Sequence, residues 1–224
     1  MRYFISTILG FCLLIGCTYR PKEKRLTKFK IIDGRILKSF YVKKNDTVEF
    51  KRILTTNLEV IVQRGKIFYG QDGLVNQKLW NEKQLEADQR VIDSLTSLFM
   101  ADGFTTNLFE ERDVMFVQIV PDSSMSDLEA LRFLNLRQEI ENKIDERIKI
   151  QMLGEWFAGD MGGGANMLFY IDEWDKASEL VIQVLREENL IDHVLIAKRL
   201  AIAKDDWTYE IVYPLEYQGP FNPM

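Results

Sequence analysis

Apolar and polar residues alternate through the part of the chain that follows residue 30. Alternation with a period of two predicts strands that bury one face. Asp33-Gly34 lies between two such apolar runs and predicts a hairpin turn, and Arg64-Gly65 is a second predicted turn. We therefore expect a strand-rich first half. The alternating apolar residues are Ile31, Ile36, Phe40, Val42, Val48 and Phe50.

The pattern changes to a helical period after residue 82. Glu82 to Met100 predicts a helix, and Gly103 is placed to end it. Phe104 to Leu108 and Val114 to Val120 then read as a hairpin of two strands. The helical stripe consists of Leu85, Ile92, Leu95 and Phe99.

A second helix is predicted over residues 126–150. Ser126 and Glu129 have the spacing of a capping box, which satisfies free backbone N–H groups at a helix start. The remaining face is charged, so we interpret this segment as a connecting helix. Its predicted buried side consists of Phe133, Ile140, Ile144 and Ile148.

The last third predicts two hairpins around one helix. The first hairpin joins Glu155–Asp160 to Asn166–Ile171, and the second joins Val194–Ile202 to Trp207–Tyr213. Asp175 caps the intervening helix in this interpretation. The order β-β-α-β-β can also be traced through residues 59–121, which would make two similar halves. The helical stripe consists of Ala177, Leu180, Val181, Val184 and Leu185.

Residues 1–17 have the layout of a secretory signal. Arg2 supplies a positive charge, Tyr3 to Ile15 form a short apolar run, and Leu14-Ile15-Gly16-Cys17 ends it. This motif resembles the lipobox of bacterial lipoproteins. The resemblance implies cleavage after Gly16 and a membrane anchor of diacylglycerol on the Cys17 thiol. An ordinary cleaved signal and a short buried helix are the alternatives.

The residues after Cys17 bear on the destination of such a lipoprotein. Thr18 stands where an aspartate favours retention in the inner membrane, so the resemblance implies the outer membrane. Residues 18–25 are basic, whereas lipoproteins of the Bacteroidota type carry an acidic cluster there for surface display. We therefore expect an anchor that faces the periplasm.

These patterns together predict an α+β fold with antiparallel sheets and two or three helices. We expect a lipoprotein signal peptide at 1–16 and a basic tether at 17–28. An N-terminal α+β half then spans 29–125, a connecting helix 126–150, and a C-terminal α+β half 151–224.

Charge is distributed unevenly between these parts. Residues 20–52 hold 12 Lys or Arg against 4 Asp or Glu, whereas residues 53–224 hold 16 against 30. The basic stretch can lie against anionic lipid headgroups or form the solvated face of strands. The acidic remainder argues against a nucleic-acid partner and favours a basic protein, such as a secreted effector.

The inventory of reactive residues leads us to assign no catalytic residue, metal site or cofactor. His193 is the only histidine, which excludes a site with two histidine ligands in one chain. Processing would remove Cys12 and modify Cys17, so no free thiol would remain. Gly162 to Gly164 lack the Lys-Ser/Thr and helix of a phosphate loop and predict a turn. Paired aspartates near turns leave a glycosidase-like hydrolase open as an alternative. They are Asp160, Asp172, Asp175, Asp205 and Asp206.

Aromatic residues beside carboxylates are the best candidates for a binding surface. Tryptophan anchors within an acidic rim are typical of an interface for a basic protein. Core packing is the competing interpretation, because Trp207, Tyr209, Ile211 and Tyr213 alternate on one strand face. The candidate contact residues are Trp156, Asp160, Trp174, Asp175, Asp206 and Trp207.

The stretch from Gly154 to Met224, with GEWFAGDMGGGANMLFYIDEWD and DDWTYEIVYP, resembles small α+β domains of uncharacterised bacterial lipoproteins. Its acidic character is similar to that of toxin-immunity proteins. The resemblance implies neutralisation of an envelope-delivered toxin by direct binding. A structural or accessory lipoprotein of an envelope complex is the alternative, followed by the carboxylate hydrolase.

Overall fold

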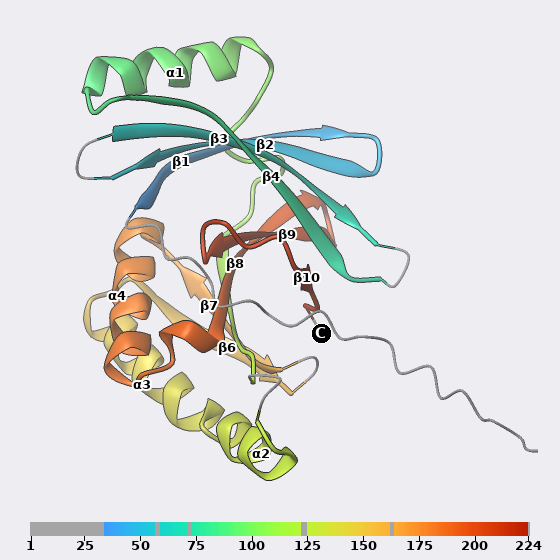
Figure 1. Cartoon of the computed structure of the whole chain (residues 1–224), viewed down its shortest axis with the longest axis vertical. Helices are drawn as coiled ribbons and strands as arrows, with labels where there is room; N and C mark the ends of the chain where they lie inside the picture. Colours follow the sequence, from blue (N-terminus) through green and yellow to red (C-terminus); the bar gives the residue numbers. More distant parts are fainter. Residues whose placement is uncertain (1–33, 57–58, 71–72, 122–124, 162–163, 224) are drawn as a thin grey trace, which may run out of the picture.

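The computed structural model describes residues 34–223 apart from 57–58, 71–72, 122–124 and 162–163. The predicted signal peptide, Cys17, the tether and Asp33 lie outside the described residues. Within them the chain forms two five-stranded antiparallel sheets and helices (Figure 1), which confirms the predicted α+β fold.

Sheet A has the order β1-β2-β3-β4-β10. Its first four strands form a meander, and the short β10 returns from the far end of the chain to pair with β4. Asn45, at a positive φ of 52°, supports the turn between β1 and β2. The strands are β1 Arg35–Lys44, β2 Thr47–Thr55, β3 Glu59–Tyr69, β4 Val75–Glu86 and β10 Pro220–Phe221.

The outer face of sheet A is partly covered by helix α1, Gln89–Ala101. Asp88 caps this helix, because its carboxylate accepts a hydrogen bond of 2.8 Å from the Arg90 N–H. Phe99 is the buried residue of the helix, and its ring packs edge-on against Phe40 of β1. Further apolar contacts come from Ile53, Val60, Val62, Leu85, Ile92 and Leu95.

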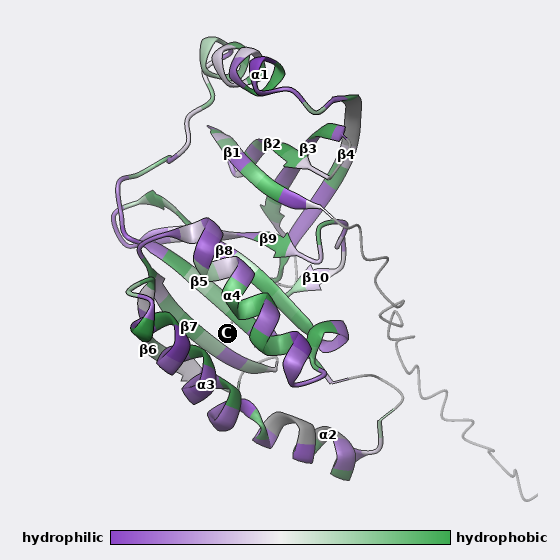
Figure 2. Ribbon diagram, turned by 90° about the vertical axis from the view of Figure 1, so that its left-hand side faces the viewer, coloured by the Kyte–Doolittle hydropathy of each residue, from purple (hydrophilic) through white to green (hydrophobic). Residues whose placement is uncertain are grey.

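Sheet B has the order β6-β7-β5-β8-β9, so β5 lies between the two predicted C-terminal hairpins. Helices α3 and α4 cover one face of the sheet (Figure 2). The stripe predicted for α4 is buried as expected. The elements are β5 Asp113–Ile119, β6 Gly154–Asp160, β7 Ala165–Ile171, β8 Val194–Ala203, β9 Asp206–Tyr213, α3 Arg137–Ile150 and α4 Trp174–Glu187.

The two sheets share a second core that joins them into one body. Tyr41, Phe50 and Ile67 of sheet A pack with Phe116 and Tyr209 of sheet B. In Figure 1, α1 lies above sheet A and sheet A lies above sheet B, while α3 and α4 lie beside the strands of sheet B. The edge strand β1 lies along one side of the junction between the sheets.

Two predicted hairpins are confirmed, whereas one predicted turn and a third predicted hairpin are wrong. The pairs β6–β7 and β8–β9 follow the predicted ranges closely. Arg64-Gly65 was wrong as a turn, because both residues lie inside β3. Strand β5 does not pair with residues 104–108, of which only Thr105 forms a bridge, to Tyr41. The predicted first helix begins at Gln89, since the preceding residues extend β4.

The predicted connecting helix is two helices. Helix α2 spans Asp127–Asn135 and α3 begins at Arg137, so four α-helices occur in the described chain instead of two or three. The order β-β-α-β-β holds for β6 to β9, but β3, β4 and α1 are followed by a strand of sheet B. The described residues therefore do not form two similar halves. The sheets also cross the predicted boundary at residue 125, through β5 and β10.

Candidate functional site

A groove separates the free edge of β1 from α4 and β9. Two adjoining cavities form it, one of about 190 Å³ and one of about 80 Å³. Both are lined by Ile36 of β1, by Trp174 and Asp175 of α4, and by Val212 of β9. Because these residues come from both sheets, the groove exists only when the two sheets are packed together.

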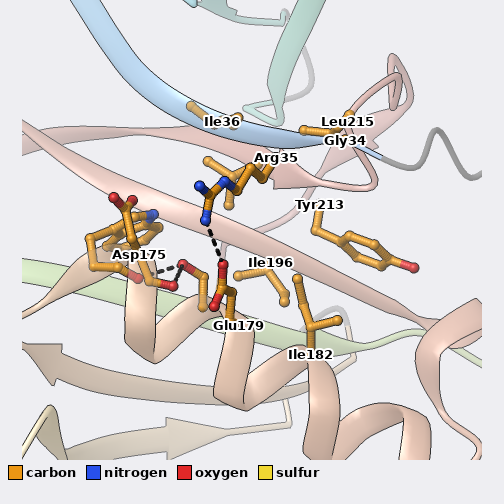
Figure 3. Close-up of a pocket in the computed structure, with 12 residues that line it drawn as sticks. Gly34, Arg35, Ile36, Asp175, Glu179, Ile182, Ile196, Tyr213 and Leu215 are labelled. Atoms are coloured by element: carbon orange, nitrogen blue, oxygen red, sulfur yellow. Dashed lines mark hydrogen bonds and ion pairs between the residues drawn. The ribbon is translucent and has the colours of Figure 1, made fainter. Parts of the chain in front are cut away.

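The smaller cavity is mostly apolar and is crossed by one ion pair (Figure 3). Arg35 of β1 reaches Glu179 of α4, with 3.0 Å between the guanidinium and the carboxylate. Both side chains are more than half exposed, so this pair adds little to stability. The apolar lining consists of Ile36, Ile182, Ile196, Val212, Tyr213 and Leu215.

The floor of the larger cavity is a buried polar network. Glu210 of β9 accepts hydrogen bonds from Arg52 Nε, from Ser39 Oγ at 3.3 Å and from the Tyr41 hydroxyl at 2.5 Å. The Arg52 guanidinium also donates to Gln63 at 3.2 Å and to the Ile211 carbonyl at 2.5 Å. This network joins sheet A to the edge of sheet B.

Burial sets the electrostatics of this network. Arg52 and Glu210 are both 0% exposed, so each charge depends on the other for compensation. Burial raises the pKa of the Tyr41 phenol well above its ordinary value, and the charge of Glu210 raises it further. Tyr41 is therefore a neutral hydrogen-bond donor throughout the physiological pH range.

The free edge of β1 presents backbone groups to the groove. The Tyr41 N–H donates to the Thr105 carbonyl at 2.7 Å, and the Thr105 N–H donates to the Tyr41 carbonyl at 2.9 Å. Tyr41 thus points its backbone groups away from β2, and Ser39, two residues earlier, points the same way. Ser39 lines the larger cavity, and within the described residues its backbone has no partner on that side. Thr106 and Asn107, which follow the bridging Thr105, line the same cavity.

The predicted contact residues Trp174 and Asp175 lie in this groove, at the start of α4. Trp174 is half-buried against the core of sheet B, and Lys198 Nζ lies 5.0 Å from the centre of its ring. Lys198 also forms an ion pair of 2.8 Å with Asp113. Trp174 therefore both packs against the core of sheet B and lines the groove.

Asp206 and Trp207 lie at the start of β9. Asp206 is exposed, and its carboxylate is 3.9 Å from Lys43 Nζ of β1. Trp207 packs against the core that joins the sheets, with the Arg199 guanidinium 5.0 Å from its ring centre. Its carbonyl accepts a hydrogen bond of 2.7 Å from the Tyr69 hydroxyl. These contacts favour the core interpretation for Trp207.

Trp156 and Asp160 lie on β6, the edge strand at the opposite side of sheet B. Trp156 is 38% exposed beside α3, and its backbone N–H donates to Asp145 at 2.8 Å. Asp160 accepts a hydrogen bond of 2.7 Å from the Asn166 amide. The six predicted contact residues therefore occupy three separate places.

Sequence reasoning missed the buried pair and the edge of β1. Arg52 shares its strand face with Val48, Phe50 and Leu54, so a charge within an inward-facing apolar series was a usable signal. Glu210 gave no such signal. It belongs to the polar positions that alternate with Tyr209 and Ile211, but both faces of β9 are buried there.

In the described part of the chain, no group of three or more His, Cys, Asp and Glu side chains is arranged to hold a metal ion. None of the helices among those residues has the length and apolar character to cross a membrane. Comparisons found no matching family model, no matching curated protein and no matching solved structure.

Proposed function

We propose that this chain is a lipid-anchored envelope protein that works by binding, and that it neutralises an antibacterial effector by direct contact. The observation that carries the binding part is the backbone of Ser39, which has no partner on the groove side of β1 in the described chain. Backbone hydrogen bonds to a sheet edge give affinity, and adjacent pockets give specificity. The anchor part rests on the Leu14 to Cys17 motif.

The proposed partner adds an extended segment to β1 next to Ser39. Thr105 already uses the neighbouring position, which supports an antiparallel arrangement. An apolar side chain of the partner would enter the cavity beside Trp174 and Val212. The Arg35–Glu179 pair spans this cavity, and because it is exposed it would open at little cost.

The anchor is tested by labelling cells with an alkyne fatty acid and comparing the native chain with Cys17→Ser. We expect label on the native chain alone, because the thiol is the proposed attachment point. Label that persists in the variant contradicts the anchor.

Neutralisation is tested by deleting the gene and challenging the cells with toxin-armed sibling strains. We expect survival to fall, and the native gene to restore it. Unchanged survival against all competitors contradicts immunity. Recovery of envelope-complex subunits in place of an effector would then favour an accessory lipoprotein.

The groove is tested in the same assay with Ser39→Pro and its control Ser39→Ala. Proline removes the outward N–H and crowds the edge without breaking the ladder to β2, so we expect protection to be lost. Alanine removes only the Ser39 hydroxyl, so protection should persist. Trp174→Ala and Trp156→Ala form a second matched pair, of which only the first should reduce protection. Equal protection by all four folded variants contradicts the groove.

A further inference from the structure

The outer face of sheet A carries two rows of side chains, of which Lys51 also contacts the C-terminal end of α1. Figure 1 shows α1 over one end of the sheet, while the hairpin of β1 and β2 extends beyond it. The register places Lys51, Arg64 and Trp80 side by side across β2, β3 and β4. The second row lies two residues further along each strand on the same face and consists of Glu49, Lys66 and Lys78.

Both rows place like charges directly opposite each other. Lys51 faces Arg64, and Lys66 faces Lys78. Like charges that face each other repel, so an anionic surface placed against the two rows would be stabilising. Carboxylates of the chain pair with part of this charge: Glu49 is shared between Lys44 and Lys66 at 2.7 Å each, and Asp102 pairs with Lys51 at 2.9 Å.

Apolar side chains are exposed beside these charges. Trp80 is 43% exposed, and Leu98 and Met100, near the C-terminal end of α1, are 54% and 58% exposed. Lys51 Nζ lies 4.6 Å from the ring centres of both Phe99 and Phe104, which places that end of α1 next to the rows. A hollow of about 300 Å³ lies between Lys51, Arg64, Lys66, Trp80 and Phe104.

We propose that this basic face, formed by Lys44, Lys51, Arg64, Lys66, Lys78 and Trp80, docks on a membrane surface of anionic phospholipid. Basic residues near such a surface are attracted to phosphate headgroups, and tryptophan is suited to the interface between water and lipid. The hollow offers space for a headgroup. The proposal does not depend on a lipid at Cys17.

The charge of the whole chain is consistent with this orientation. Residues 35–86 hold 10 basic and 6 acidic residues, whereas residues 87–224 hold 12 and 26. Sheet A would therefore face the anionic surface and the acidic part would point away. Gly34 lies 17 residues after Cys17, a stretch of chain that spans at most about 60 Å, which leaves room for this orientation under an anchor.

The test uses the unlipidated chain 17–224 carrying Cys17→Ser, sedimented with vesicles of phosphatidylglycerol and phosphatidylcholine in equal parts. We expect binding that falls as salt is raised and that is absent with pure phosphatidylcholine. The triple variant Arg64→Gln, Lys66→Gln and Lys78→Gln should weaken binding on the order of 100-fold, since each basic residue near the surface is worth about fivefold.

Two further variants make the test decisive. Lys149→Gln, Lys176→Gln and Arg186→Gln change the net charge equally on the acidic part and should leave binding unchanged. Lys22→Gln, Lys24→Gln and Arg25→Gln change the basic segment before Gly34. The docking of the basic face is overturned if the variant at Lys149, Lys176 and Arg186 loses as much binding as the variant on the basic face. It is also overturned if only the variant at Lys22, Lys24 and Arg25 loses binding, or if the native chain does not bind. None of these outcomes bears on the groove or on fatty-acid labelling.

Discussion

At the scale of single residues, the buried ion pair of Arg52 and Glu210 gives the clearest prediction about stability. Breaking a buried ion pair leaves the remaining charge without compensation, which costs about 3–5 kcal/mol. We expect Arg52→Met to lower the free energy of unfolding in urea by about this amount. The double variant Arg52→Met with Glu210→Leu should lose less than the sum of the single variants, because neither charge remains.

The control for this pair is Arg35→Met, which breaks the exposed contact with Glu179. Exposed pairs contribute roughly 0–1 kcal/mol, so its effect should be small. A loss for Arg52→Met no greater than that for Arg35→Met would contradict the importance of the buried pair. The same measurement reports on the groove, since Glu210 forms part of its floor.

Gly65 was wrongly predicted to form a turn, because the glycine is required for close packing inside β3. Its absent side chain leaves room for the Phe50 ring and for the Lys78 carbonyl oxygen, which would lie 2.5 Å from a Cβ atom. We expect Gly65→Ala to destabilise the fold by about 1–3 kcal/mol in thermal unfolding. Lys66→Ala, whose side chain is exposed on the other face, is the control. Equal melting temperatures for the two variants would contradict this reason for the glycine.

Buried tyrosines predict a loss of stability at high pH. Burial raises the pKa of Tyr209 and of Tyr217 to about 12. Since the folded pKa lies above the unfolded value of about 10, the stabilising effect is complete below pH 10 and is lost as the pH rises toward 12. Tyrosinate absorbance should therefore rise in two stages, the second together with loss of the circular dichroism signal. Titration of all tyrosines near pH 10 in a folded chain would contradict this.

At the scale of elements, the sequence pattern predicted strand pairing correctly where the two paired strands and their turn are adjacent in sequence. The hairpins β6–β7 and β8–β9 are of this kind, and the buried stripe of α4 was also predicted correctly. The predicted pairing of β5 was wrong because its partners, β7 and β8, lie dozens of residues away and no local pattern specifies them. The groove could not be predicted for the same reason, since its two sides come from different sheets.

The N-terminus of α2 depends on the predicted capping box. Ser126 Oγ donates to Glu129 at 2.7 Å, and the Ser126 N–H donates to the same carboxylate at 2.9 Å. These hydrogen bonds lower the pKa of Glu129. Removal of the cap by Ser126→Ala should cost the helix about 1 kcal/mol. We expect faster amide exchange in α2 and unchanged exchange in α4; unchanged protection in α2 would show that the cap is dispensable.

At the scale of the whole molecule, the two sheets are joined at three places that are distant in sequence. The Arg52–Glu210 network links β2 to β9, the shared core links Phe50 to Phe116, and β10 returns from sheet B to pair with β4. Gln77 of β4 strengthens this junction, because its side-chain amide bonds both the N–H and the carbonyl of Ile211. The backbone groups of Ile211 on the edge strand β9 are thereby occupied by side chains of sheet A, so they are not available for pairing with another chain.

This junction predicts that the two sheets unfold together. Phe221 of β10 is 0% exposed, and its ring packs edge-on against Phe116 and Tyr209, with ring centres 5.1 Å and 5.5 Å away. Phe221→Ala should cost about 3–5 kcal/mol because it leaves a cavity between the sheets. Under native conditions, amide exchange in β2 and in β7 should accelerate by the same factor. Faster exchange in β2 with β7 unchanged would mean that sheet A opens independently, and the groove between the sheets would then be a transient feature.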